Sequence, residues 1–337
     1  MAKAAIAGLG SIAPLHLEAL KQLGITVAAT CDPNTAKNAD YTGYEEMIDA
    51  GGFDVLHICL PHYLHAPAAI YAMDRGINVL CEKPMAISIA EAENMIRTAE
   101  HNNVSLGVIF QNRYNPGAMM IKKALTSGAG SEGSTLGKVK AGALKVNWFR
   151  SEEYYTESDW RGKWATEGGG VLINQSIHTF DLANYFLGGK PDYVEASITN
   201  RGHPSIEVED VAWGIISYGD VKISFHVNTI HPFDAPVSLE LICENGRAQI
   251  EGDDAIIEYN DGSFEKPPEP AAGDMFSLPP GAKSYWGISH TRQIKAFYES
   301  LEQNVKPEID GEEALKTQRL ICGIYESAKT GVRVVLA

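Results

Sequence analysis

Short apolar runs alternate with amphipathic stretches over the first 120 residues, and this alternation constrains the fold more than any other feature. Five runs read as strands, at KAAIAGLG (3–10), TVAAT (26–30), DVLHICL (54–60), INVLC (77–81) and SLGVIF (105–110). Helical patterns lie between them, at 12–23, 44–50, 65–75 and 88–101. Strands that are apolar throughout and alternate with helices are typical of a parallel sheet covered on both faces. The first part of the chain is therefore predicted to be a doubly wound α/β domain.

The pattern changes after Tyr114, where a helix expected at 116–126 leads into a Gly/Ser-rich loop at 127–138. Long strand-like runs follow, at 138–149, 193–200, 210–219, 221–227, 237–246 and 247–253. Several are consecutive and joined by turn signals, which predicts a large, open, mostly antiparallel sheet. Further helices are expected at 172–187, 289–303 and 311–329, and 260–285 reads as a long surface loop that could serve as a substrate lid. The second part is predicted to be an α+β domain.

The chain totals limit the class of protein. The 337 residues exceed one ordinary core, so we place two domains at 1–120 and 121–337. A formal net charge of −15 leaves no basic stripe for phosphates and argues against a nucleic-acid partner. No apolar run approaches the length of a membrane span and the N-terminus has no signal-peptide pattern, so we expect no membrane partner and a cytoplasmic location. The five cysteines show no CxxC spacing and are interpreted as reduced structural thiols.

The segment GLGSIA (8–13) follows the first strand and opens the first helix. Such a turn needs Gly8 for its tight backbone and Gly10 for the close approach of a pyrophosphate, which then meets the helix N-terminus. Asp32 ends the second strand about 20 residues on, where a carboxylate can accept both ribose hydroxyls of the adenosine half. The same carboxylate would repel a 2′-phosphate. We therefore expect a dinucleotide cofactor, with NAD preferred over NADP.

Two later strand ends carry polar residues to the same edge of the predicted sheet. The run at 54–60 continues into PHYLH, which places Pro61 and His65 beside the cofactor crevice. His62 and His65 lack the spacing and the partners of a metal site, so no metal is expected. The run at 77–81 ends in Glu82 and Lys83. A lysine at a strand end is usually a solvated side chain, but in a cofactor crevice its ammonium can stabilise the alkoxide that develops during hydride transfer.

The segment GGGVLINQSIHTFD (168–181) supplies a second polar group. In a helix at 172–187, Asn174, His178 and Asp181 would share one face. Histidine is the only one of these three residue types whose ordinary pKa lies near neutrality, so His178 suits proton transfer. The alternative is a buried structural histidine held by Asp181. Just upstream, the arginines and aromatic rings of NWFRSEEYYTESDWRGKW (147–164) suit hydroxyl-rich or anionic sugars, and we interpret Tyr155, Arg161 and Trp164 as pocket wall or lid.

Taken together, GLGSIA, CEKP and GGGVLINQSIHTFD resemble the glucose-fructose oxidoreductase/inositol dehydrogenase/MocA (Gfo/Idh/MocA) family, and the similarity extends over nearly the whole chain. The resemblance implies an N-terminal Rossmann domain and a C-terminal domain whose open sheet often forms dimers. It also implies NAD(P)-dependent oxidation or reduction of sugars, cyclitols or their derivatives. The family's catalytic lysine and histidine correspond to Lys83 and His178.

The motifs and the resemblance together predict two sets of site residues. The predicted cofactor-binding residues are Gly8, Gly10, Ser11, Ile12, Asp32, Pro61, His65, Glu82, Lys83 and Gln111. The predicted substrate-binding residues are Lys83, Tyr155, Arg161, Trp164, Asn174, His178 and Asp181. One position departs from many polyol-oxidising relatives, which resemble this chain but carry an aspartate where Asn174 stands. An amide cannot relay a proton as a carboxylate does, so this position leaves open whether Asn174 takes part in proton transfer or only orients the substrate.

The predicted function is hydride transfer between a nicotinamide cofactor and a secondary alcohol or ketone of a sugar, cyclitol or sugar derivative. Two alternatives stay open: a glycosidase or epimerase that recycles its NAD, and a sugar-sensing regulator without catalysis. The expected partners are a small sugar or polyol and further copies of the chain, in a homodimer or homotetramer formed through the C-terminal sheet.

Overall fold

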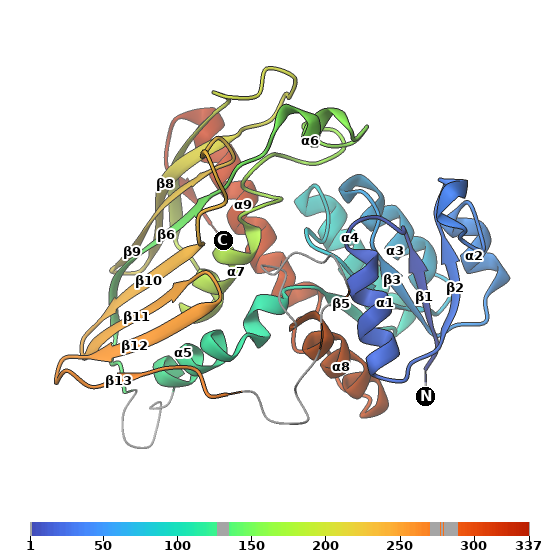
Figure 1. Ribbon diagram of the computed structural model, residues 1–337, viewed down its shortest axis with the longest axis horizontal. Coiled ribbons are helices and arrows are strands. Elements are labelled where there is room, and N and C mark those ends of the chain that lie inside the picture. The colour runs from blue at the N-terminus through green and yellow to red at the C-terminus, as the bar shows by residue number, and fades with distance from the viewer. Residues whose placement is uncertain (1, 127–134, 270–276, 278, 280–288, 337) are drawn as a thin grey trace. The chain divides into compact units, whose positions relative to one another are not determined.

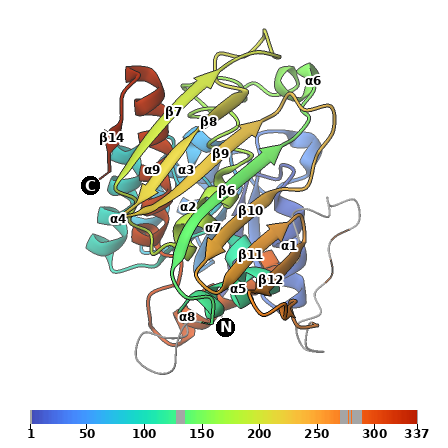
Figure 2. The same ribbon diagram turned by 90° about the vertical axis from the view of Figure 1, so that its left-hand side faces the viewer.

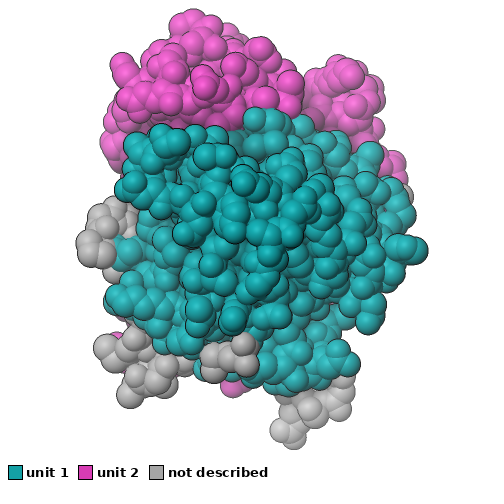
Figure 3. Space-filling model, turned by 90° about the vertical axis from the view of Figure 1, so that its right-hand side faces the viewer, with its two compact units in different colours: residues 1–111, 272–318 teal, residues 112–271, 319–337 magenta. Residues whose placement is uncertain are grey.

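The computed structural model describes residues 2–126, 135–269, 277, 279 and 289–336. By its internal contacts the chain divides into two compact units, shown in separate colours in Figure 3. Unit 1 comprises Met1–Gln111 and Ala272–Gln318, and unit 2 comprises Asn112–Ala271 and Arg319–Ala337. Each unit has its own sheet.

Unit 1 is built on a five-stranded parallel sheet (Figure 1). The strands are β1 (Ala4–Ala7), β2 (Val27–Cys31), β3 (Val55–Ile58), β4 (Asn78–Cys81) and β5 (Leu106–Val108), in the order β2-β1-β3-β4-β5. The helices are α1 (Ala13–Gln22), α2 (Tyr44–Ala50), α3 (His65–Met73), α4 (Ile89–Asn102) and α8 (Ser289–Glu302), with short 3₁₀ turns η1 (Thr35–Lys37), η2 (His62–Leu64) and η3 (Gln111–Tyr114). From β1 the chain crosses to β2 on one side, and from β3 it crosses to β4 on the opposite side. Because crossovers between parallel strands are right-handed, α1 and α3 lie on opposite faces of the sheet. The predicted doubly wound sheet is confirmed.

Helix α8 lies beside α1 although nearly 270 residues separate them in the sequence. Ile294, Phe297 and Tyr298 of α8 share one buried cluster with Leu20 of α1 and with residues of β1 and β3. Strand β5 is adapted to this neighbour, because a Cβ on Gly107 would lie 2.6 Å from the Phe297 ring. The amide of Gln293 accepts from the N–H of Phe110 (3.0 Å) and donates to the carbonyl of Val108 (2.7 Å). The α8 segment therefore completes the core of unit 1.

Unit 2 is built on a nine-stranded sheet in the order β13-β12-β11-β10-β6-β9-β8-β7-β14 (Figure 2). The strands are β6 (Val139–Asn147), β7 (Tyr193–Thr199), β8 (Val211–Tyr218), β9 (Val221–Asn228), β10 (Ser238–Cys243), β11 (Gly246–Glu251), β12 (Asp254–Tyr259), β13 (Phe264–Glu265) and β14 (Val334–Val335). Every pairing is antiparallel except β6 with β9. The helices are α5 (Pro116–Thr126), α6 (Glu152–Thr156), α7 (Ile177–Phe186) and α9 (Gly311–Thr330), the last of which begins in unit 1. The predicted mostly antiparallel sheet is confirmed.

The two faces of the unit 2 sheet differ in what covers them. Helices α5 and α7 contact β10, β11, β12 and β6, and the Phe180 ring of α7 lies edge-on to Phe225 of β9. On the other face, the register places Trp213 opposite His226 and Ile215 opposite Ser224. Trp213 and Ile215 are 43% and 42% exposed. Among the described residues, no helix covers this second face of the sheet, which faces the viewer in Figure 2 and which we call the open face.

Several sequence-based boundaries differ from the structure. The helix expected at 172–187 begins only at Ile177 (α7), and residues 168–176 form turns instead. Strands β12 and β14 were not predicted, and β13 lies inside the expected loop at 260–285. Most of that expected lid, and residues 127–134 of the expected Gly/Ser-rich loop, lie outside the described residues. In the part of the chain that is described, no helix combines the length and apolar character needed to cross a bilayer.

Candidate active site

The turn after β1 has the geometry of a dinucleotide-binding loop. Gly8 has φ +90°, and a Cβ there would lie 2.6 Å from the carbonyl oxygen of Cys59 at the end of β3. Gly10 is different, because a Cβ there would meet no atom within 4 Å. Helix α1 then begins at Ala13 with no side-chain cap on Ile12. The turn at 8–12, which includes Ser11, thus leaves open space at Gly10. This space lies next to a helix N-terminus whose N–H groups have no side-chain cap. A bound pyrophosphate requires both features.

The carboxylate of Asp32 is tied to this turn. One oxygen accepts a hydrogen bond from the N–H of Leu9 (2.8 Å), and the other accepts one from the N–H of Asn34 (2.8 Å). These bonds hold the carboxylate at the end of β2 beside the glycine turn, while the side chain stays half-buried. A carboxylate has further lone pairs, so ribose hydroxyls can still donate to Asp32. The residues present fit the adenosine half of NAD.

His65 is placed by the structure in a backbone bridge. It is 1% exposed, and its ring nitrogens lie 2.8 Å from the carbonyl oxygen of Leu60 and 2.7 Å from that of Pro84. It therefore joins the end of β3 to the segment after β4, where the Lys83–Pro84 peptide bond is cis. Pro61, which precedes η2, is half-buried at the same edge of the sheet. The polar atoms of His65 face the backbone rather than the crevice.

Glu82 also points inward. It is 5% exposed, and one carboxylate oxygen lies 3.0 Å from Nε2 of His16 and 3.3 Å from Nε2 of His290. Burial opposes ionisation, but hydrogen bonds from His16 and His290 hold the pKa of Glu82 well below its usual range. Lys83, the next residue, is half-buried at the carboxyl edge of the sheet. Sequence reasoning missed both histidines, although a carboxylate ending a buried strand signals that it needs partners.

Gln111 ends the first segment of unit 1. Its side chain is 3% exposed, and Oε1 has no hydrogen-bond partner among the described residues. An unpaired buried carbonyl oxygen is costly, which suits a residue whose partner is a bound group.

In unit 2, three glycines form the turn that precedes α7. The carboxylate of Glu209 accepts from the N–H groups of Gly170 and Leu172, both at 2.9 Å, and from the hydroxyl of Tyr325 at 2.9 Å. A Cβ on Gly169 would lie 2.0 Å from that hydroxyl, and one on Gly170 would lie 1.9 Å from the Glu209 carbonyl oxygen. Burial raises the pKa of Glu209 to about 7 despite these donors. The glycines are required because the turn wraps closely around Glu209 and Tyr325.

The expected stripe of Asn174, His178 and Asp181 on one helix is wrong for its first member. Asn174 lies in the turn before α7, where its N–H donates to the carbonyl of Gly170 (3.1 Å). Its side-chain amide donates to the fully buried carboxylate of Glu167 (2.6 Å). Only His178, which is half-buried, and Asp181 belong to the helix. A carboxylate is thus present beside Asn174, but it comes from an upstream residue that sequence reasoning missed.

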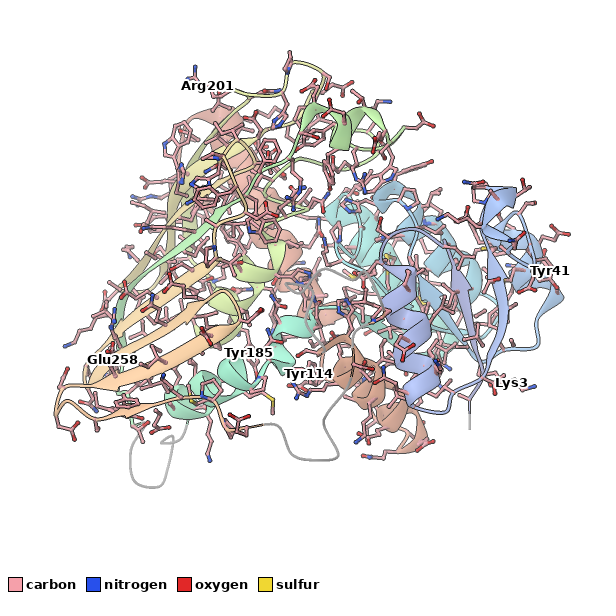
Figure 4. All side chains as sticks on the ribbon, in the orientation of Figure 1. Lys3, Tyr41, Tyr114, Tyr185, Arg201 and Glu258 are labelled. Atoms are coloured by element: carbon pink, nitrogen blue, oxygen red, sulfur yellow. The ribbon has the colours of Figure 1, made fainter. Side chains whose placement is uncertain are left out.

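Asp181 is fully buried and forms a bidentate ion pair with Arg113, with both N–O distances 2.7 Å. The Arg113 guanidinium also lies 4.5 Å from the ring centroid of Tyr185, which is labelled in Figure 4. This buried ion pair joins α7 to η3. The expectation that Asp181 faces a cleft is therefore wrong.

The predicted pocket residues of the upstream segment are placed differently from one another. Tyr155 is 3% exposed, with its hydroxyl 3.2 Å from Oγ1 of Thr229, so it belongs to the core of unit 2. Trp164 is 39% exposed and donates to the carbonyl of Glu207. The Arg161 guanidinium lies 4.3 Å from the ring centroid of Tyr154. The Tyr154 hydroxyl lies 3.4 Å from the Asn174 amide nitrogen, which links Arg161 to the turn before α7.

Comparison with known proteins decides the family. A model of an oxidoreductase family with an NAD-binding Rossmann fold matches residues 2–110, and a model of the GFO/IDH/MocA C-terminal domain matches residues 130–249. The chain belongs to the Gfo/Idh/MocA oxidoreductase family. It is therefore an oxidoreductase with an NAD-binding Rossmann domain, as the sequence motifs indicate.

Relatives of the chain include dehydrogenases named for a sugar and for a cyclitol. The chain is 26% identical over 299 residues to D-xylose 1-dehydrogenase (NADP(+)) 2 of Haloferax volcanii, covering 88% of this chain and 84% of the relative. It is 26% identical over 262 residues to inositol 2-dehydrogenase of Rubrobacter xylanophilus, covering 73% and 70%. Among solved structures, the WlbA dehydrogenase of Bordetella pertussis in complex with NADH and UDP-GlcNAcA has a TM-score of 0.83 at 26% identity, covering 100% of this chain and 99% of that one.

Proposed function

We propose that this oxidoreductase oxidises a secondary alcohol of a sugar, cyclitol or sugar derivative with NAD, or reduces the corresponding ketone. The observation that carries the proposal lies within unit 1. The glycine turn with its anchored Asp32 and the Lys83 segment stand at the same carboxyl edge of one parallel sheet, which is where this fold binds its ligand. Relatives named for D-xylose and inositol support a polyhydroxylated substrate.

Each proposed catalytic residue has one role. NAD, when bound, supplies the hydride acceptor. His178 takes the proton of the substrate hydroxyl, and the Lys83 ammonium stabilises the developing alkoxide and helps to place its oxygen. In the direction of reduction, His178 returns the proton. Asn174, held by Glu167, orients the substrate and does not relay the proton, because an amide has no titrating proton.

The test is a panel of compounds combined with one variant. NADH fluorescence is followed with NAD or NADP against D-xylose, myo-inositol, levoglucosan and UDP-sugars. We expect turnover with NAD on at least one of these compounds, and a loss of about 100-fold or more in Lys83→Met with NADH affinity retained. Lys306→Met, at an exposed lysine, is the matched control.

Three results would contradict the proposal. Undiminished turnover in Lys83→Met removes the lysine from the chemistry, and loss of NADH binding in that variant makes it a cofactor ligand instead. Product formed without net NADH identifies an enzyme that recycles its cofactor.

We also propose that the chain forms a homodimer or homotetramer through the open face of the unit 2 sheet. That face exposes Trp213 and Ile215 on β8 and Ile242 on β10, with β9 and β6 between these two strands. Exposed apolar side chains on an open sheet face favour association with another surface. Sedimentation equilibrium of the purified chain measures the oligomer.

A cytoplasmic location stays a proposal. It is supported by Cys31, Cys59, Cys81 and Cys243, which are buried free thiols, as a reducing compartment maintains.

A further inference from the structure

A buried cluster in unit 1 brings together three side chains from distant parts of the sequence. His16 comes from α1, Glu82 from the end of β4 and His290 from α8, and they are 0%, 5% and 3% exposed. Both histidines direct Nε2 at the same carboxylate oxygen of Glu82, at 3.0 and 3.3 Å. We call these residues the His16–Glu82–His290 triad.

The triad continues into a chain of hydrogen bonds. Nδ1 of His16 lies 2.8 Å from Nδ1 of His57, whose Nε2 lies 3.0 Å from the hydroxyl of Tyr298. A buried carboxylate with only neutral partners would leave an uncompensated charge, which is strongly unfavourable. A His16 imidazolium removes that cost, because it donates to Glu82 from one nitrogen and to His57 from the other. Charge balance therefore favours an ion pair of His16 and Glu82.

The second oxygen of Glu82 connects the triad to the backbone. It accepts a hydrogen bond from the N–H of Lys83 at 3.2 Å. The carboxylate therefore bonds at one end to α1 and α8 and at the other to the peptide from which the Lys83 side chain extends. Glu82 thus accepts three hydrogen bonds, from His16, His290 and the N–H of Lys83. The ionised carboxylate has acceptor sites on both oxygens for all three, whereas protonation would turn one oxygen into a donor.

We propose that the His16–Glu82–His290 triad positions Lys83 by keeping Glu82 ionised and its peptide group fixed. The role given to Lys83 rests on the proposed function, whereas the contacts of the triad do not. His16 and His290 are positioning residues, since they act through Glu82 and do not touch the reacting atoms.

The protonation states agree with this role. Burial alone would lower the pKa of His16, but hydrogen bonds to Cys59 and Glu82 and the charge of the Glu82 carboxylate raise it. Burial and the neighbouring His16 charge keep the pKa of His57 well below its usual value, so His57 stays a neutral acceptor. Other titratable groups near Glu82 are Cys59 and Cys81, whose burial raises their thiol pKa values, and His65, whose burial lowers its ring pKa. Glu82 accordingly stays ionised across the neutral range.

The experiment is a pH profile of His16→Gln, which keeps a donor but removes the charge. Without the imidazolium, burial raises the pKa of Glu82, so an acidic limb absent from the wild type appears in the kcat profile. We expect kcat on the best panel compound to fall about 10- to 100-fold at the acid end, with NADH affinity unchanged. The double variant His16→Gln/Glu82→Gln has no carboxyl to titrate, so it loses the limb and stays slow at every pH.

A second measurement does not need turnover. Reductive ¹³C-methylation gives each lysine an NMR resonance, and the one absent from Lys83→Met belongs to Lys83. In His16→Gln this resonance shifts and acquires a pH dependence that His16→Gln/Glu82→Gln lacks.

Met95→Ala is the control for destabilisation, because it removes a fully buried side chain of α4 outside the triad. It lowers the melting temperature but changes neither profile. If His16→Gln does not fold, His290→Gln removes the other bond to the same oxygen and is expected to produce a smaller limb.

Three outcomes would overturn the proposal. One is a folded His16→Gln with wild-type kcat, pH profile and Lys83 resonance. Another is a stoichiometric transition metal in the purified protein that is lost in Glu82→Gln, since the ligand atoms of the triad lie within 4.8 Å of one another. The third is the same acidic limb in Met95→Ala. If Lys83→Met keeps its turnover, the proposed function fails in its assignment of the lysine, and the Lys83 resonance still decides the positioning.

Discussion

Gly8 and Gly10 stand two residues apart in one turn, yet they are glycines for different reasons. Gly8 has a positive φ and lies against the Cys59 carbonyl, so a side chain there collides with the protein itself. Gly10 has neither constraint, because a Cβ there would enter open space. The requirement for glycine at Gly10 therefore comes from a bound group rather than from folding.

This difference predicts two separable effects. Gly10→Ala is expected to keep the wild-type melting temperature but to weaken NADH binding about tenfold or more, since the methyl group occupies the space of the pyrophosphate. Gly8→Ala is expected to lower stability by about 1–3 kcal/mol and to weaken NADH binding as well. Calorimetry and a fluorescence titration of NADH measure both quantities. Equal losses of stability in the two variants would contradict the assignment of roles.

The sequence predicts those candidate site residues whose proposed roles are local. Gly8, Gly10 and Asp32 are predicted because one strand–turn–helix unit carries them, and Lys83 because a charge at the end of a buried strand is conspicuous. The partners of Glu82 were not found, since they come from α1 and α8 and only the folded chain brings them together. Asp181 was misplaced for the same reason, because Arg113 reaches it from η3. Side chains that pair across such long stretches of sequence show no fixed spacing from which the contact could be predicted.

At the scale of elements, a buried carboxylate holds the first part of the turn at 168–176. Glu209 accepts from the N–H groups of Gly170 and Leu172, and the hydroxyl of Tyr325 donates to the same carboxylate. The helix expected over 172–187 begins only after this turn, at Ile177. The turn and the first residues of α7, which include His178, therefore depend on the charge of one buried carboxylate.

This dependence predicts how Tyr325→Phe changes with pH. The folded pKa of Glu209, about 7, lies above its unfolded value, so folding takes up protons between about pH 4.5 and 7 and stability falls as pH rises through that window. Losing the Tyr325 donor raises the folded pKa further and extends this fall to higher pH. We expect a loss of less than about 1 kcal/mol at pH 5 and about 2 kcal/mol at pH 8. Urea unfolding at both pH values measures it, with the exposed Tyr63→Phe as control. Equal losses at pH 5 and pH 8 would count against the linkage.

Most elements were predicted within a few residues because their hydrophobic period is strong. The strands of unit 1 and helices α8 and α9 belong to this group. Strand β12 was missed because Asp254 and Glu258 flank its short apolar centre, and it is held by pairing with β11. Nothing in the period of α8 indicates that it packs on α1, since that contact depends on Gly107 giving room to Phe297.

At the scale of the whole molecule, the open face of the unit 2 sheet is the feature that bears on assembly. Trp213 and Ile215 stand on β8, the third strand from the β14 edge of the sheet. We expect Trp213→Glu to shift the chain toward monomer, because a buried carboxylate in an interface is uncompensated. Light scattering after gel filtration measures the mass. Phe264→Glu, at an exposed residue of edge strand β13, is the matched control and leaves the mass unchanged. A wild-type mass for Trp213→Glu would exclude this face as the interface.

Unit 1 is made of two segments of chain, and this has a consequence for synthesis on the ribosome. Residues 1–111 emerge first, but α8 follows only after strands β6 to β13 of the unit 2 sheet have been made. At about 5–20 residues per second, the nascent Rossmann sheet waits on the order of ten seconds or more with the flank of α1 uncovered and Glu82 lacking His290. During that interval the growing chain exposes the apolar surface of α1, β1 and β3 that its own distant α8 segment later covers.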